Sequence, residues 1–329
     1  MSMAATRRAE AMDARQKIAI VGAGLMGHGI AQIFAAHGHP VSIHDPNGDV
    51  LAAVPARVEA IMQTLGIDIA LAANIVLCDR LEDAVESAAL VIEAAPERVA
   101  LKQSIFEELD RLAGPQTILA SNTSVIPITE IAAKAANKKR ILGTHFWNPP
   151  HYVPLVEVIQ TAETDPAHIA WTLELMASVG MSAVHVKKDV AGFIGNRLQH
   201  ALKREAIALV ADGVCDAATL DKVVREGFGA RLGVLGPLEQ SDMIGLQLTL
   251  DCHEVLLPHL DNTPGAHPFL REKIAKGETG MAVGKGFRAW TEEEADGVRR
   301  RFQDYMAACA RKRRDENMNA CQNARDSAK

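Results

Sequence analysis

Short apolar runs alternate with longer amphipathic stretches along roughly the first 190 residues of the chain. The runs are rich in β-branched residues and have the length of buried strands, whereas the stretches between them show helical spacing. Strands that alternate with helices predict a doubly wound, parallel sheet. We expect strands at 18–21, 41–43, 75–77, 90–92, 117–120, 140–144, 153–159 and 183–186, with helices at 50–65, 99–112 and 128–136.

The pattern changes at the segment 187–196. Beyond it, apolar residues such as Leu198 and Leu202 recur at helical spacing, and no stretch alternates as a strand does. Asp216 has the chemistry of an N-cap, and Pro237 that of a first helical residue. The sequence therefore predicts four parts: a flexible leader, an α/β sheet domain, an all-helical domain and a disordered tail, at 1–15, 16–190, 191–310 and 311–329.

Three glycines follow the first strand with the spacing G-x-G-x-x-G. Gly22 would form the tight turn, Gly24 would let the backbone approach a pyrophosphate, and Gly27 would let the helix pack closely on the strand. The pair Leu25–Met26 begins the helix, whose free N–H groups and positive dipole end favour phosphates. Asp45 ends the second strand, where a carboxylate binds ribose hydroxyls and repels a 2′-phosphate. These features predict a Rossmann-type domain that binds NAD rather than NADP.

The composition narrows the possible functions. The chain has 329 residues, 48% of them hydrophobic, and a net charge of −6, so nothing favours nucleic acid as a partner. Its apolar stretches are too short to span a membrane, and its first residues do not have the apolar core of a signal peptide. Five scattered cysteines without a C-x-x-C pair are typical of a reduced, cytoplasmic protein. We therefore expect a globular protein with a small-molecule substrate, without nucleic-acid or membrane partners.

Two later segments carry polar groups that could perform chemistry. The strand at 117–120 leads to Asn122 and Ser124, which would face the nicotinamide end of a ligand at the carboxyl edge of the sheet. The strand with His145 is followed by two prolines, which fix a bend, and then by a strand with Glu157. Such a bend could bring Glu157 against His145. An imidazole oriented by a carboxylate is what alcohol oxidation requires, because it takes the hydroxyl proton as hydride leaves carbon.

These residues have other interpretations as well. A histidine in a strand is commonly a packed core or surface residue, and Glu157 could be an exposed charge. His145, His151 and Glu157 could also bind a metal ion, although their spacing matches no zinc pattern.

The chain resembles the L-3-hydroxyacyl-CoA dehydrogenase superfamily over residues 16–300, in six segments that keep the order GAGLMGHGIA, SNTS, THFWNPP, PLVEVI, KDVAGFIGNRL and GPLEQSDMIGL. The resemblance implies an NAD-dependent oxidoreductase of fatty acid metabolism. Such an enzyme oxidises a 3-hydroxyacyl-CoA, such as 3-hydroxybutyryl-CoA, to the 3-oxoacyl-CoA. It also implies a homodimer in which the C-terminal helices form much of the interface.

The resemblance also implies roles for single residues. His145 matches the catalytic base of the superfamily, and Glu157 matches its partner. Ser124 and Asn196 match the groups that hold the substrate oxygen and position the reacting carbon. The positions matched to cofactor contacts beyond the glycine turn and Asp45 are Glu97, Lys102, Asn122, Ser124 and Asn148.

One segment departs from the fatty-acid enzymes. Their helical region after the second strand tends to be basic and helps to hold coenzyme A, and phosphates need Lys or Arg partners. Here residues 46–79 contain one basic residue, Arg57, against the acids Asp49, Glu59, Asp68 and Asp79. CoA-free branches of the superfamily act on L-gulonate (the lambda-crystallin type), carnitine or a pyridine-ring aldehyde. These substrates are alternatives to a 3-hydroxyacyl-CoA, and a non-catalytic, crystallin-like NAD-binding protein is a further one.

Overall fold

The computed structural model describes residues 15–327, apart from the side chains of 314, 315 and 317–327. The leader predicted at 1–15 therefore lies outside the described residues, except for Arg15. The chain divides into two compact units, Met1–Asn196 with Gln303–Lys329 and Arg197–Phe302. Among the described residues, no helix is both long enough and apolar enough to cross a membrane.

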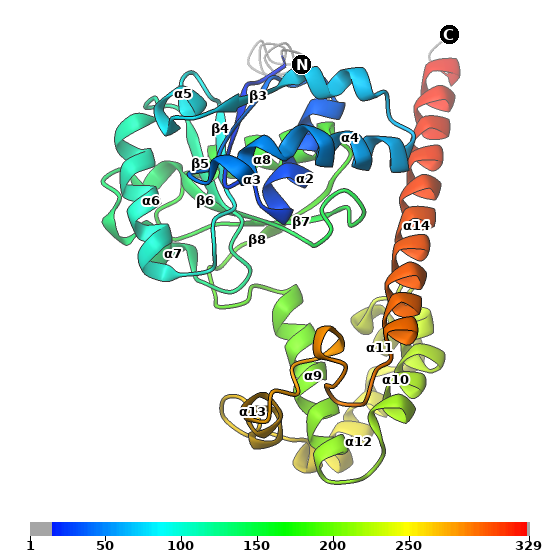
Figure 1. Ribbon diagram of the computed structural model, residues 1–329. Coiled ribbons are helices and arrows are strands. Elements are labelled where there is room, and N and C mark those ends of the chain that lie inside the picture. The colour runs from blue at the N-terminus through cyan, green and yellow to red at the C-terminus, as the bar shows by residue number, and fades with distance from the viewer. Residues whose placement is uncertain (1–14, 328–329) are drawn as a thin grey trace. The chain divides into compact units, whose positions relative to one another are not determined.

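Within the described part of the chain, eight strands form one sheet in the order β3-β2-β1-β4-β5-β6-β7-β8 (Figure 1). The order reverses direction at β1, which lies between β2 and β4. In a doubly wound sheet such a reversal opens a crevice at the carboxyl ends of the strands. The strands are β1 (Ile18–Val21), β2 (Val41–His44), β3 (Ile75–Cys78), β4 (Leu90–Glu93), β5 (Ile118–Ser121), β6 (Ile141–Phe146), β7 (Leu155–Ile159) and β8 (Ser182–Val186).

The predicted sheet is confirmed, with one difference in strand direction. β7 runs antiparallel to β6, whereas the other neighbouring strands in the described sheet are parallel. A parallel connection needs a crossover of about a dozen residues or more. The segment 147–154 between β6 and β7 is too short for that, and it turns back through a cis peptide bond between Asn148 and Pro149.

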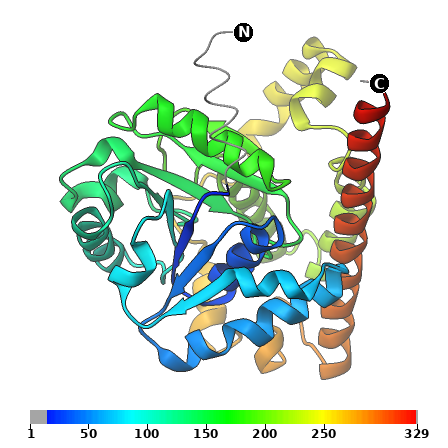
Figure 2. The same cartoon turned by 90° about the horizontal axis from the view of Figure 1, so that it is seen from above.

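Helices cover both faces of this sheet (Figures 1 and 2). Each face has its own apolar core, because successive residues of a strand point to opposite faces. In β1, for example, Ile18 and Ile20 belong to one core and Ala19 and Val21 to the other. The first core is covered by α2 (Leu25–Ala36), α4 (Val54–Leu65) and α8 (Pro166–Ser178), and the second by α5 (Leu81–Val85), α6 (Val99–Leu112) and α7 (Ile128–Ile131).

The helix predicted at 50–65 is two helices, α3 (Gly48–Ala52) and α4. Pro55 lies in the first turn of α4, where its missing N–H costs nothing, so it starts a new helix rather than continuing the old one. Short 3₁₀ turns complete the unit at Ile69–Asn74, Ala132–Lys134 and Lys138–Arg140.

The second unit is helical, as the sequence predicts. The predicted N-cap is present, since the Asp216 carboxylate accepts a hydrogen bond from the Thr219 N–H at 2.7 Å. Its elements are α9 (Gly195–Ala211), α10 (Ala217–Glu226), α11 (Pro237–Ile244), α12 (Leu246–Leu256) and α13 (Pro268–Ala275), with 3₁₀ turns at Phe228–Arg231, Leu257–His259 and Met281–Val283.

The end of the chain differs from the predicted disordered tail. The last helix, α14, runs over Glu292–Ser327, so the described residues after 311 are helical. The segment 311–329 does not have an apolar stripe, but it is free of glycine and proline, and nine of its nineteen residues are Ala, Arg or Lys. These are strong helix formers, so intrinsic propensity favours continuing a helix that is already nucleated.

Candidate active site

The glycine turn after β1 is built as the sequence predicts. Gly22 has a φ of 103°, and a Cβ there would lie 2.7 Å from the Ala94 carbonyl oxygen. A Cβ on Gly27 would lie 1.7 Å from the Gly22 oxygen, so α2 packs against the turn as closely as a glycine allows. A Cβ on Gly24, in contrast, would meet nothing within 4 Å. Gly24 therefore leaves open the space through which a pyrophosphate would approach the start of α2.

Asp45 fixes the shape of this turn. Its carboxylate accepts hydrogen bonds from the N–H of Ala23 at 2.8 Å and of Asn47 at 2.9 Å. The first residues of α2 differ in exposure: Leu25 is exposed, whereas Met26 packs on the core beneath it. The donor set fits NAD, with helix N–H groups for the phosphates and a carboxylate at the end of β2 for the ribose.

His145 and Glu157 form a buried pair. They are directly opposite each other in the antiparallel register of β6 and β7, so their side chains project from the same face of the sheet. His145 Nδ1 donates to Glu157 Oε2 over 2.7 Å. The other carboxylate oxygen accepts hydrogen bonds from the N–H groups of Ile194 at 2.9 Å and Gly195 at 3.1 Å, at the start of α9.

These bonds set the charge of the pair. Burial opposes ionisation of Glu157, but hydrogen bonds from His145 and from the Gly195 and Ile194 N–H groups outweigh it and lower the pKa of Glu157. Glu157 therefore carries a negative charge at neutral pH. A carboxylate on Nδ1 fixes the ring orientation and leaves Nε2 as the nitrogen that can accept a proton.

Aromatic rings surround the imidazole. The ring centroids of Trp147 and Phe193 lie 5.3 Å and 5.7 Å from that of His145. Trp147 packs so closely on the start of α9 that a Cβ on Gly195 would lie 2.3 Å from the indole. Neither ring was predictable from the sequence, because the motif around His145 indicates its chemistry and not its packing.

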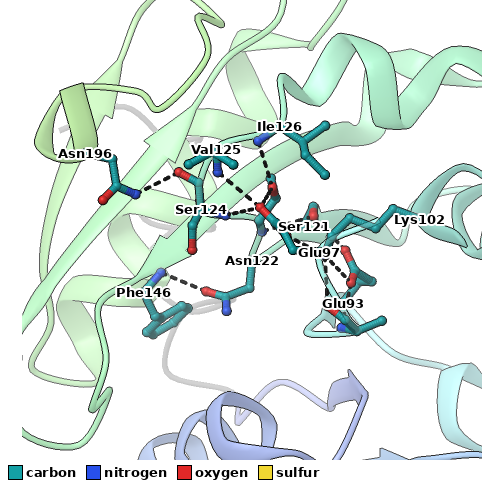
Figure 3. Close-up of polar contacts among 12 residues, drawn as sticks. Glu93, Glu97, Lys102, Ser121, Asn122, Ser124, Val125, Ile126, Phe146 and Asn196 are labelled. Carbon is teal, nitrogen blue, oxygen red and sulfur yellow. Dashed lines mark hydrogen bonds and ion pairs between the residues drawn. The ribbon is translucent and has the colours of Figure 1, made fainter. Parts of the chain in front are cut away.

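The loop after β5 brings further predicted residues to this edge of the sheet (Figure 3). Asn122 ties the loop to β6, since its Oδ1 accepts a hydrogen bond from the Phe146 N–H at 2.9 Å. Asn196 Nδ2 donates to the backbone oxygen of Ser124 over 2.8 Å. Ser124 is exposed, so its hydroxyl is available to a ligand.

Glu97 and Lys102, the two cofactor contacts predicted in the segment after β4, differ in the exposure of their side chains. The Glu97 side chain is 37% exposed and pairs with Lys102 over 3.4 Å, whereas the Lys102 side chain is 1% exposed. Lys102 forms a buried ion pair with Glu93, with 2.7 Å between Nζ and Oε1, and Glu93 is not among the residues predicted from the sequence. An acid that ends a buried strand, as Glu93 ends β4, is the signal that could have revealed it.

The remaining two candidates lie in the turn between β6 and β7. Asn148 is exposed there. His151 packs against α2 instead of joining His145, since a Cβ on Gly29 would lie 3.5 Å from His151 Nδ1. Burial and the nearby His28 lower the pKa of His151 to about 4. Among the described residues, the structure brings together no three His, Cys, Asp or Glu side chains that could hold a metal ion.

Comparisons with known proteins identify the family. Residues 17–190 match the model of the 3-hydroxyacyl-CoA dehydrogenase NAD-binding domain, and residues 192–290 match that of the C-terminal domain. The chain therefore belongs to the 3-hydroxyacyl-CoA dehydrogenase family. Like its relatives, it is an NAD-dependent dehydrogenase.

Individual relatives differ in the substrate that they are named for. The chain is 37% identical over 284 residues to 5-formyl-3-hydroxy-2-methylpyridine 4-carboxylate 5-dehydrogenase of Mesorhizobium japonicum, covering 85% of this chain and 92% of that one. It is 36% identical over 290 residues to a probable 3-hydroxybutyryl-CoA dehydrogenase of Bacillus subtilis, covering 84% and 98%. A crystal structure of the pyridine-carboxylic acid dehydrogenase, described as an NAD⁺-dependent dismutase, has a TM-score of 0.84 at 34% identity, covering 92% and 99%.

Proposed function

We propose that the chain oxidises a carbon that bears both a hydrogen and a hydroxyl group, with His145 as the catalytic base. The observation that carries this proposal is the buried pair of His145 Nδ1 and Glu157 Oε2, 2.7 Å apart at the carboxyl edge of the sheet. Because Nδ1 is bonded to Glu157, Nε2 is the nitrogen that takes the proton of the substrate hydroxyl group, and Glu157 stabilises the imidazolium that results.

The other residues of the site hold the substrate. The Ser124 hydroxyl donates to the substrate oxygen as it becomes a carbonyl oxygen. Asn196 Nδ2 has two hydrogens, one of which is bonded to the Ser124 backbone oxygen, and the other would donate to the same substrate oxygen. The glycine turn at Gly22 and Gly24 and the start of α2 would hold NAD, which would supply the acceptor for the hydride. His145, then protonated, supports the reverse reduction.

Within this reaction we propose a small, CoA-free carboxylic acid as the substrate, and a ring aldehyde in its hydrated form as the first candidate. An aldehyde hydrate presents the same H–C–O–H unit to His145 as an alcohol does. Two observations support this choice: the likeness to the pyridine-carboxylate dehydrogenase, and Arg57 as the one basic residue in 46–79. A 3-hydroxyacyl-CoA is the second candidate, favoured by the family and by the Bacillus relative.

A substrate screen tests the choice. We expect NADH formation with a pyridine-ring aldehyde that carries a neighbouring carboxylate, at a higher kcat/KM than with L-gulonate, carnitine or 3-hydroxybutyryl-CoA. No NADH from any of the four would contradict the proposed reaction itself.

A truncated thioester separates the two candidate substrate classes. An enzyme built for CoA uses binding energy from the remote nucleotide, so its kcat/KM falls strongly when the nucleotide is removed. For this chain we expect acetoacetyl-CoA and the corresponding pantetheine thioester to have similar kcat/KM in the direction of reduction. A loss of about a hundredfold on truncation, or about 2.7 kcal/mol, would restore the CoA-dependent candidate.

We also propose that the chain forms a homodimer through its helical unit. Of the hydrophobic residues in 197–302, all described, Ala208 and Ala295 are buried, whereas Val234 is 90% and Leu238 79% exposed. Exposed large apolar side chains that gather on one unit are what a subunit interface requires. We expect sedimentation equilibrium to give twice the chain mass of 35.4 kDa. A mass equal to that of one chain at micromolar concentration would contradict the dimer.

The cytoplasmic location stays a prediction. The cysteines described by the structure as free are Cys78, Cys215, Cys252 and Cys309, which is consistent with a reducing compartment.

A further inference from the structure

Lys102 is covered almost entirely by the protein itself. It lies in the second turn of α6 and is 1% exposed, which is exceptional for a lysine. The resemblance of the sequence implies that this residue contacts the cofactor. Its burial leaves almost no surface with which it could do so.

The hydrogen bonds of Lys102 lead to the same conclusion. An ammonium group has three donors. Lys102 Nζ donates hydrogen bonds to Glu93 Oε1 at 2.7 Å and to the Ala95 backbone oxygen at 3.1 Å, and it forms an ion pair with Glu97 Oε2 at 3.4 Å. Two of its donors therefore have acceptors inside the protein, and both carboxylates that neutralise its charge belong to the protein as well.

Glu93 connects this lysine to the neighbouring strand. Its side chain is fully buried at the end of β4 and accepts hydrogen bonds from Ser121 Oγ and from the Ala95 N–H, both at 2.6 Å. Ser121 is the last residue of β5. The Glu93–Lys102 pair therefore fixes the ends of β4 and β5 relative to the first turns of α6.

Glu97 connects Lys102 to the loop after β5, which carries Ser124 (Figure 3). Its Oε1 accepts three hydrogen bonds, from Thr123 Oγ1 at 2.6 Å and from the N–H groups of Ser124 at 2.9 Å and Val125 at 3.1 Å. Burial opposes ionisation of Glu97, but the bond from Thr123 and the charge of Lys102 outweigh it and lower its pKa. Thr123 and Lys102 thus both favour the charged form of Glu97, and Glu97 holds the peptide that carries Ser124.

We infer that Glu93 and Lys102 are positioning residues for the Ser124 loop, acting through Glu97, and that Lys102 is not a cofactor ligand. The inference rests on the proposed function, in which the Ser124 hydroxyl holds the substrate oxygen. It predicts that loss of the Glu93–Lys102 pair lowers the rate of the reaction and leaves NAD affinity unchanged.

The test compares Lys102→Met with the double variant Glu93→Gln/Lys102→Met. Lys102→Met leaves a buried carboxylate without its partner, so it is expected to unfold at a lower temperature. The double variant replaces the ion pair with neutral groups of similar size, so its unfolding temperature is expected to return close to that of the wild type. Because the double variant is expected to be as stable as the wild type, a lower rate in this variant would report the position of Ser124 and not a loss of stability.

Three measurements on the double variant decide the inference. We expect an unchanged Kd for NAD by calorimetry and faster amide exchange at Ser124 and Val125. With the substrate found in the screen, we expect a kcat about 10- to 100-fold lower, the usual cost of misplacing a reacting group. The control is Lys138→Met, which breaks the surface pair with Glu163, 3.7 Å apart, and should change none of the three.

The opposite pattern would overturn the inference. A Kd for NAD raised about tenfold or more, with kcat unchanged, would make Lys102 a cofactor ligand. Unchanged amide exchange at Ser124 and Val125 would show that the pair does not hold the loop. The NAD affinity and exchange measurements need no substrate, so they remain decisive even if the proposed reaction fails.

Discussion

Replacing His145 with glutamine is expected to lower kcat by about 10²- to 10⁴-fold, the usual contribution of general acid–base catalysis. Glutamine keeps a polar group near the Glu157 carboxylate but cannot take a proton from a hydroxyl group. The affinity for NAD, measured by calorimetry, should stay unchanged, because the cofactor binds on the glycine turn at β1. A variant that keeps most of the wild-type kcat would end the assignment of His145 as the base.

Replacing Glu157, the other residue of the pair, is expected to lower kcat less than replacing His145 does. Glu157→Gln removes the charge that stabilises the imidazolium, so protonation of the free enzyme becomes less favourable. The acidic limb of kcat/KM for the oxidation is therefore expected to move to lower pH. The double variant His145→Gln/Glu157→Gln should lose little more than His145→Gln alone, because the two residues act as one unit. Additive losses would show that Glu157 acts independently.

His185 provides a matched control. Its Nε2 is hydrogen-bonded to Gln160 Oε1 over 2.8 Å, and it lies on β8 of the same sheet. In the register of β7 and β8, Glu157 is opposite Val184 and Val158 is opposite His185. Successive side chains alternate between faces, so His185 projects from the face opposite to that of the His145–Glu157 pair. His185→Gln should keep wild-type kcat and the wild-type pH profile.

The second large effect is expected at Gly27, where alanine should prevent stable folding of the sheet domain. The added Cβ would lie 1.7 Å from the Gly22 carbonyl oxygen, which is backbone and cannot rotate away. Relief requires α2 to move off β1, at a cost above the roughly 1–3 kcal/mol of ordinary overpacking. Thermal unfolding should show a large drop in Tm or no folded protein, and a wild-type Tm would contradict the geometry.

Gly24→Ala is the control for this effect. Gly24 has a φ of −65°, which alanine adopts freely, and a Cβ there would meet nothing within 4 Å. Its Tm should equal that of the wild type. NAD affinity should nevertheless fall, because the methyl group occupies the space that the pyrophosphate needs. If Gly24→Ala bound NAD as tightly as the wild type does, the cofactor could not lie on this turn.

Much of the fold follows from local patterns in the sequence. Strand and helix positions follow from the period of the apolar residues, and helix α6, predicted at 99–112, has those bounds. The glycine turn was also predictable, because the strand, the glycine spacing and the helix that define it are consecutive in sequence, although Gly22 also packs against the distant Ala94. Two differences between the prediction and the structure have local causes. Pro55 divides the helix predicted at 50–65 into two, and strong helix formers extend α14 through the predicted tail.

The sequence by itself therefore determined the order of the strands and helices, the NAD-binding turn and the residue types for hydride chemistry. It also placed His145 and Glu157 on strands joined by a proline bend, so that they could meet. Whether they meet depends on strand register, and only the tertiary structure decided that they face each other with Nδ1 and Oε2 2.7 Å apart.

The tertiary structure alone decided the role that the buried charges can take. Glu93 and Lys102 meet across the turn between β4 and α6, and Ser121 joins them from β5. The Ser121 contact depends on β5 lying beside β4 in the sheet, and no spacing in the sequence reveals that neighbour. Burial has the same origin: the sequence gives Lys102 its charge, but the surrounding elements remove it from solvent and pair it with Glu93 and Glu97.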